Sequence, residues 1–183
     1  MRVVAGLVAA ALSLFAADRS GPYLGAGAGI GIYDDSGRLA DIESRNVPQL
    51  RVSAGAFINK HLSVALEYGQ FQAFKGKTSD GLSTLEYFKT LTADVFGHYP
   101  VMDDRLDLYA KFGAGEIYWD ETGAMEHSSS AATLLYGVGV GLRPWTRLTF
   151  NLGYDFYQFG MDDGTKTYNM YLGSAYLELQ VQF

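Results

Sequence analysis

Five charged side chains of both signs stand inside segments that are otherwise apolar or small. They come from separate parts of the chain: Arg51, Glu67, Asp94, Lys111 and Glu178. In each case the residues immediately before and after are apolar, so the charge lies in the opposite phase of an alternating pattern. Charges enclosed by a fold must pair, because an unpaired buried charge is severely penalised. We therefore predict a salt-bridged interior network, with a switchable gate built from the same residues as the alternative hypothesis.

Other groups with reactive side chains give weaker evidence of chemistry. The chain has no cysteine, which excludes disulfides, thiolate metal sites and a cysteine nucleophile. His61 and His98 are too scattered to indicate a metal site. Acidic residues in polar segments match no calcium loop and are expected to be solvated, with binding of divalent cations that bridge lipopolysaccharide as the alternative: Asp34, Asp35, Asp80, Asp120, Glu121, Asp162 and Asp163. We therefore expect no metal and no cofactor.

The composition narrows the class of protein. The chain has 183 residues and a formal net charge of -6, which predicts a single domain. Nucleic-acid binding is not expected, because a phosphate backbone demands clustered Lys and Arg. After the first segment, no apolar run approaches the roughly 20 residues that a membrane helix requires. A membrane barrel is compatible with this pattern, since alternating strands contain no long apolar run.

Eight segments of period two would position the charged residues. In each segment one phase is aliphatic or aromatic and the other is small or polar, which is typical of strands in a membrane barrel. The segments cover residues 24–32, 49–58, 62–69, 90–99, 106–114, 134–143, 147–156 and 174–183. The sequence therefore predicts an all-β fold, an eight-stranded antiparallel up-and-down transmembrane β-barrel.

The charged residues decide which phase faces lipid. A charge facing the middle of the bilayer costs about 2 to 4 kcal/mol, so the charged phase must line the interior. A soluble barrel would show the opposite polarity. Glu116 falls in the lipid phase, which suggests a bulge or the membrane rim at that position. The charges in the opposite phase are Arg51, Glu67, Asp94, Asp107, Lys111, Arg143, Arg147, Asp155 and Glu178.

The connections alternate between short and long. Tight turns are predicted at residues 59–61, 102–105 and 144–145, and longer polar loops at 34–46, 75–84, 120–130 and 160–166. Tight turns belong in the periplasm and longer loops outside. Aromatic residues near the segment ends predict two interfacial girdles, although ordinary enrichment in strands is the alternative. The lower girdle is Tyr99, Trp145 and Phe183, and the upper is Tyr33, Phe74, Tyr87, Phe88, Tyr118, Trp119 and Phe159.

The two ends of the chain carry export and assembly features. A positive charge at Arg2, an apolar core over residues 3–15 and the small pair Ala16-Ala17 predict a signal peptide over residues 1–17. An anchor helix is the alternative, but the apolar run is too short to span. The barrel domain is then expected over residues 18–183. The final aromatic residue, Phe183, resembles the C-terminal signal by which the assembly machinery recognises outer-membrane barrels.

The chain as a whole resembles the transmembrane domain of outer membrane protein A and its single-domain relatives. The resemblance is carried by "LTADVFGHYPVMDDRLDLYAKFGAG" at 91–115, and supported by "YLGAGAGIGIY" from Tyr23, "QLRVSAGAF" from Gln49 and "LTFNLGYDF" from Leu148. It implies a monomer in the outer membrane of a Gram-negative bacterium, surrounded by lipid and lipopolysaccharide. It also implies assembly through periplasmic chaperones and the barrel assembly machinery.

Two departures from that family limit what the resemblance implies. Members with the full layout carry a C-terminal peptidoglycan-binding domain, which is not expected here because the chain stops at Phe183. The seventh-strand Arg and Glu of the family's interior gate align with Asn151 and Gly153. The gate therefore cannot be transferred to this chain.

Three functions remain to be separated. The first is a structural or surface-interaction role, in envelope integrity, adhesion or ligand contact through the outer loops. The second is a narrow gated channel. The third is a lipid A-modifying enzyme, since His127 two residues before Ser129 resembles the lipid A deacylase barrels. Those enzymes have Asn where Ser130 stands and hold the group on a membrane-embedded strand, whereas here a loop is expected. We therefore expect a protein that is not an enzyme.

Overall fold

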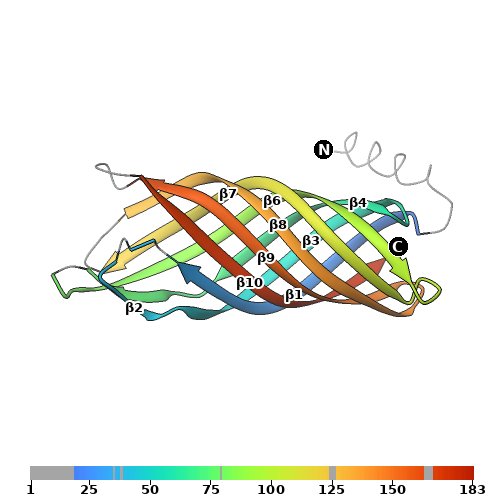
Figure 1. Ribbon diagram of the computed structural model, residues 1–183, viewed down its shortest axis with the longest axis horizontal. Coiled ribbons are helices and arrows are strands. Elements are labelled where there is room, and N and C mark those ends of the chain that lie inside the picture. The colour runs from blue at the N-terminus through green and yellow to red at the C-terminus, as the bar shows by residue number, and fades with distance from the viewer. Residues whose placement is uncertain (1–18, 35, 38, 79, 124–126, 163–166) are drawn as a thin grey trace, which may run out of the picture.

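The computed structural model is a closed antiparallel barrel of eight long strands (Figure 1). It describes residues 19–34, 36–37, 39–78, 80–123, 127–162 and 167–183. Strands adjacent in the chain pair in order, and β1 pairs with β10 to close the sheet. The described residues include no helix long and apolar enough to span a bilayer. The long strands are β1 (Gly21–Asp34), β3 (Asn46–Asn59), β4 (Leu62–Phe71), β6 (Ser83–Val101), β7 (Leu106–Gly123), β8 (His127–Trp145), β9 (Leu148–Asp162) and β10 (Thr167–Gln182).

The two ends of the barrel differ in their connections. At one end lie the tight turns and the C-terminal residue Phe183, and we name this the turn end. At the opposite end, the loop end, two short strands extend the sheet, β2 (Asp41–Ser44) and β5 (Phe74–Lys77). β5 pairs with β6 and β2 pairs with β5. The predicted signal peptide, residues 1–17, lies outside the described residues.

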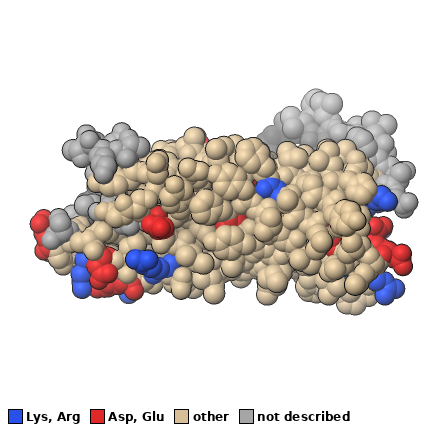
Figure 2. Space-filling model, in the orientation of Figure 1, with Lys and Arg blue, Asp and Glu red and all other residues tan. Residues whose placement is uncertain are grey.

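The predicted eight segments all form strands, and their two faces have the predicted polarity. On β3, Leu50 is 67% exposed while Arg51 is 4% exposed, and the same alternation continues on β4. On the face shown in Figure 2, most charged side chains lie toward the two ends and the middle is largely uncharged. The charged phase therefore lines the interior, as predicted. Arg147 is an exception, because it lies exposed in the β8–β9 turn.

Two local predictions were wrong, and one alternative of a third is excluded. The last turn lies at Thr146 and Arg147 rather than at 144–145, because the β8–β9 register shifts after Leu142 and Trp145 pairs with Leu148. Of the two alternatives for Glu116, the bulge is excluded, since the register of β7 is continuous with both neighbours, and the membrane rim stays a prediction. Residues 128–130 belong to β8 rather than to a loop, because the ladder with β7 continues past the predicted segment ends and pairs the backbone groups there.

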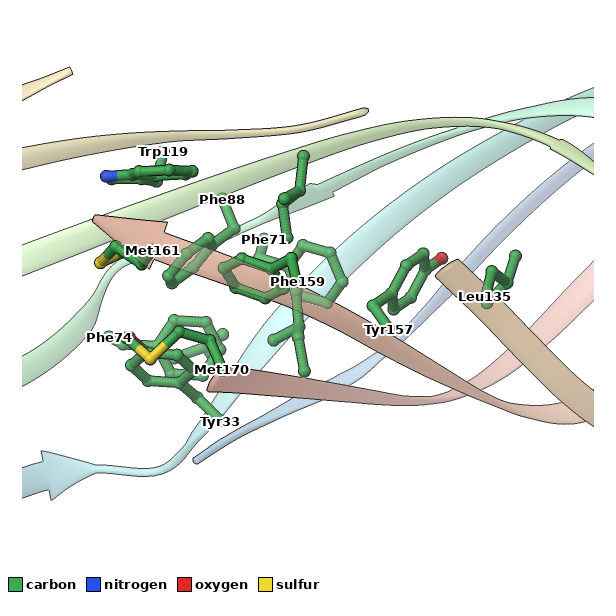
Figure 3. Close-up of a cluster of buried hydrophobic side chains, with 13 residues drawn as sticks. Tyr33, Phe71, Phe74, Phe88, Trp119, Leu135, Tyr157, Phe159, Met161 and Met170 are labelled. Carbon is green, nitrogen blue, oxygen red and sulfur yellow. The ribbon is translucent and has the colours of Figure 1, made fainter. Parts of the chain in front are cut away.

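The upper aromatic girdle was also predicted wrongly. Tyr87 and Tyr118 face outward, but the other five aromatic residues assigned to it point into the barrel. They belong to a buried group near the loop end, which we name the aromatic cluster (Figure 3). In the lower group all three residues are exposed, as predicted. The aromatic cluster consists of Tyr33, Val47, Phe71, Phe74, Phe88, Ile117, Trp119, Leu135, Tyr157, Phe159, Met161, Met170 and Leu172.

Candidate functional site

The candidate site is a group of paired charges inside the barrel. Five strands each contribute one buried residue, and we name this group the charge cluster: Arg51, Glu67, Lys111, Asp155 and Glu178. Each side chain points inward because it occupies the phase opposite the lipid-facing residues of its strand.

Arg51 is the centre of the charge cluster. Its three guanidinium nitrogens bind three carboxylates: Nη2 lies 2.7 Å from Glu67 Oε2, Nη1 2.9 Å from Asp155 Oδ2, and Nε 3.1 Å from Glu178 Oε2. Its Cζ lies 3.5 Å from the ring centroid of Tyr176, a cation–π contact. One guanidinium thus joins carboxylates from three strands.

Lys111 supplies the second cation. Its ammonium group lies 2.9 Å from Asp155 Oδ2 and also binds Glu67. Asp155 and Glu67 are therefore each shared between Arg51 and Lys111. Such enclosed pairs satisfy one another's charge without necessarily stabilising the fold more than apolar residues would.

Inward glycines leave the space that these long side chains occupy. A Cβ added at Gly137 would lie 2.3 Å from Asp155 Oδ1 and 2.9 Å from Lys111 Cε. At Gly25 it would lie 2.6 Å from Glu178 Oε1. All three distances are shorter than real Cβ contacts, so a side chain at either position would have to displace the charged groups that fill the barrel there.

The position of Asp94 differs from that of the other predicted network residues. It is buried and accepts a hydrogen bond from the Thr92 hydroxyl at 3.1 Å. In the described part of the chain it forms no salt bridge. Asp155 was predicted to point inward but was not among the predicted network residues. In the structure it binds both Arg51 and Lys111.

Further layers lie on the turn-end side of the charge cluster. Tyr23, Phe57 and Phe96 belong to a second buried apolar group. Beyond it, His98 Nδ1 lies 2.7 Å from Asp107 Oδ2. The void among these side chains measures about 20 Å³, close to the space that a single water molecule needs.

The remaining candidate chemistry is spread over the loop end. Ser128, Ser129 and Ser130 are exposed on β8, while the side chain of His127 lies outside the described residues. Asp35 and Asp163 also lie outside them. Among the described residues, no group of three or more His, Asp or Glu side chains is placed to hold a metal ion.

Comparisons with known proteins agree on the architecture. The profile of the outer membrane protein beta-barrel domain matches residues 3–176. No curated sequence is significantly similar to the chain. The fold is similar to that of Neisserial surface protein A, with a TM-score of 0.64, 18% identity, and coverage of 88% of this chain and 97% of that one.

Two further solved structures show the same fold. The attachment invasion locus protein of Yersinia pestis has a TM-score of 0.62 at 15% identity, covering 91% of this chain and 100% of that one. The N-terminal barrel domain of Pseudomonas aeruginosa OprF has a TM-score of 0.54 at 12% identity, covering 86% of this chain and 96% of that one. At these identities the likeness establishes the fold alone.

Proposed function

The chain belongs to the outer membrane protein beta-barrel domain family, and from this premise we propose that it is a closed, non-catalytic barrel with a structural and surface-contact role. It is a protein of the bacterial outer membrane. Its lipid-facing band anchors it there, and its loop end offers the surface for contact with lipopolysaccharide or an external ligand.

The filled interior is the observation that carries this proposal. The charge cluster closes the barrel at one height and the aromatic cluster closes it again toward the loop end. An eight-stranded barrel has room for side chains but not for an additional channel. Opening a path would require both clusters to rearrange, which supports a static plug over the gated channel.

The orientation follows from the two kinds of connection. We propose that the turn end faces the periplasm and the loop end faces outward, as the lengths of the connections favour. The signal peptide over residues 1–17 would be removed during export. Phe183, exposed at the turn end, would serve as the recognition residue for the barrel assembly machinery.

Single-channel recording in planar bilayers tests the proposal. We expect the purified barrel to insert without stable stepwise conductance, in parallel with a porin as positive control. Reproducible steps would contradict the closed barrel and support the gated channel. A lipid A deacylation assay, with His127→Ala as control, tests the non-catalytic part, and His127-dependent product would overturn it.

A deletion strain tests the cellular role. We expect loss of the protein to increase detergent sensitivity or to reduce adhesion. Complementation with a variant that keeps the barrel but shortens residues 36–44 separates the structural role from the surface-contact role. The shortened variant would restore detergent resistance if the role is purely structural, but it would not restore adhesion that depends on this segment. Unchanged sensitivity and adhesion in the deletion strain would contradict the proposal.

A further inference from the structure

A cavity of about 790 Å³ opens at the turn end of the barrel. Four arginines line it, Arg19, Arg105, Arg143 and Arg147, against three acidic groups: Asp103 and Asp104 on the β6–β7 turn and the C-terminal carboxylate of Phe183. The excess of arginine favours an anionic occupant. Neither the charge cluster nor the proposed surface contacts use this cavity.

Two of the arginines converge on one aromatic ring. The Cζ atoms of Arg19 and Arg143 lie 4.7 and 5.9 Å from the ring centroid of Phe57. Two guanidinium groups of the same sign gathered at one ring repel each other unless an anion lies near both. Asp107 meets this need for Arg19, with which it forms a salt bridge.

Arg143 forms no salt bridge among the described residues, although the carboxylates of Asp107 and Asp104 lie near enough to interact with its charge. Its Nη2 reaches only the amide oxygen of Gln182, at 3.5 Å, and its Nε makes no hydrogen bond. None of the described carboxylates lies within salt-bridge distance of it. Arg19, whose side chain is 4% exposed, likewise keeps Nε and Nη1 unsatisfied. Buried donors without acceptors are rare in proteins, and here they border one cavity.

The surroundings of the cavity identify the membrane surface as the source of the anion. Trp145 and Phe183 line the same cavity and are 64% and 66% exposed. Exposed aromatic residues at the end of a transmembrane barrel lie at the level of the lipid headgroups. Arginine binds phosphate oxygens through its planar fork of donors.

We infer that this cavity binds the phosphate group of an anionic phospholipid, with the Arg143 guanidinium as the donor. The inference rests on the proposed orientation, which places the turn end in the inner leaflet. Trp145 and Phe183 flank the acyl chains of the bound lipid. The site gives the barrel a lipid preference at its periplasmic rim, independent of its loops.

Quenching by bromine-labelled lipids tests this site. The variant Trp119→Phe leaves Trp145 as the single tryptophan of the two in the chain. This protein is reconstituted into phosphatidylcholine vesicles that contain bromine-labelled phosphatidylglycerol or bromine-labelled phosphatidylcholine. We expect phosphatidylglycerol to bind beside Trp145 about fivefold more tightly, the effect of one basic residue near a membrane surface.

Two substitutions on this background separate a site from general attraction. Arg143→Gln should reduce the preference to about one. Lys60→Gln removes a positive charge from the exposed β3–β4 turn at the same end, away from the cavity, and should leave the preference unchanged. Heat-modifiable migration on a gel shows that both variants still form the barrel.

The alternative outcomes overturn the inference. No preference in the Trp119→Phe protein, or an equal loss with Lys60→Gln, means that no built site exists. Loss of the preference on adding inorganic phosphate, but not sodium chloride of equal ionic strength, means that the occupant is a soluble phosphate rather than a lipid. None of these results depends on conductance. The closed-barrel function is tested by single-channel recording, so it can fail or hold independently of the lipid site.

Discussion

The charge cluster and the aromatic cluster lie in the same barrel interior but have opposite polarity. On β7, Lys111 belongs to the first and Trp119 to the second, and both point inward. The outward face of β7 changes in the opposite direction, from the apolar Phe112 to the charged Glu116, which lies nearer the loop end. Along this strand the interior changes from charged at Lys111 to apolar at Ile117 and Trp119.

The two clusters also hold the fold together in different ways. The five residues of the charge cluster depend on one another, because removing one partner leaves a buried charge without compensation. The aromatic cluster is a set of packed rings. The ring centroid of Phe88, for example, lies 5.0 Å from that of Tyr33 and 5.9 Å from that of Phe159. Removing part of one ring costs the contacts of that part and leaves a small cavity, but it strands no charge. A single substitution in the charge cluster should therefore cause a large loss in the free energy of unfolding. A substitution in the aromatic cluster should cause a loss in proportion to the atoms removed.

Arg51→Gln should have the largest effect. Three carboxylates lose their shared cation, so we expect a loss of about 3–5 kcal/mol in the free energy of unfolding, the usual cost of breaking a buried ion pair. The measurement is urea unfolding in lipid vesicles, followed by tryptophan emission. Arg45→Gln, at an exposed arginine far from the arginine-lined cavity, is the control and should change stability by less than about 0.5 kcal/mol. Equal losses in the two variants would show that the charge cluster does not act collectively.

Gly137→Ala should have the next largest effect. The added methyl group would meet Asp155 and Lys111, whose side chains are held by ion pairs and cannot withdraw freely. We expect a loss of about 1–3 kcal/mol, typical of overpacking. Gly97→Ala is the matched control on the outer face, where the nearest atom would lie 4.0 Å away. If both variants unfold at the wild-type urea concentration, the interior is not tightly packed at Gly137.

The period-two alternation was sufficient to predict whether a strand side chain points into the barrel or toward lipid. It did not predict which side chains it meets there. Period two placed Arg51, Glu67 and Lys111 inside, and the same phase carried on from Asp94 along β6 reaches Phe88. The inward position of Phe88 was thus available from the pattern. The girdle interpretation failed because it assigned aromatic residues by distance from the segment ends, without following the phase.

The height of each residue could not be obtained in this way. In a closed barrel the strands are tilted and staggered, so residues at equal distances from their turns do not lie at one level. The grouping of Asp155 with Arg51, and the separation of Asp94 from the salt bridges, depend on that stagger. The arginine-lined cavity was missed for the same reason, since Arg19 and Arg143 are distant in sequence and meet only at Phe57.

Phe88→Leu should have a smaller effect than either change in or beside the charge cluster. Leucine keeps the site apolar and loses only part of the ring contacts, so we expect a loss of about 1 kcal/mol. Single-channel recording should remain silent, because the charge cluster still closes the barrel. A loss as large as that of Arg51→Gln would contradict the gradual response expected of the aromatic cluster.

The smallest effect is expected from the exposed ion pair between β2 and β5. Lys77 Nζ lies 2.7 Å from Glu43 Oε1, and this hydrogen bond lowers the pKa of the Glu43 carboxyl. A lowered pKa in the folded state stabilises the fold above the pKa of the unfolded carboxyl, and the contribution is lost as the pH falls through the folded value. Because both groups are solvated, the contribution should be too small to detect by unfolding. Lys77→Gln should therefore return the pKa of Glu43, followed by carboxyl NMR, toward its ordinary value while the urea midpoint stays unchanged. A shifted midpoint would mean that charge pairs stabilise both regions of this barrel, and that burial is not what distinguishes the charge cluster.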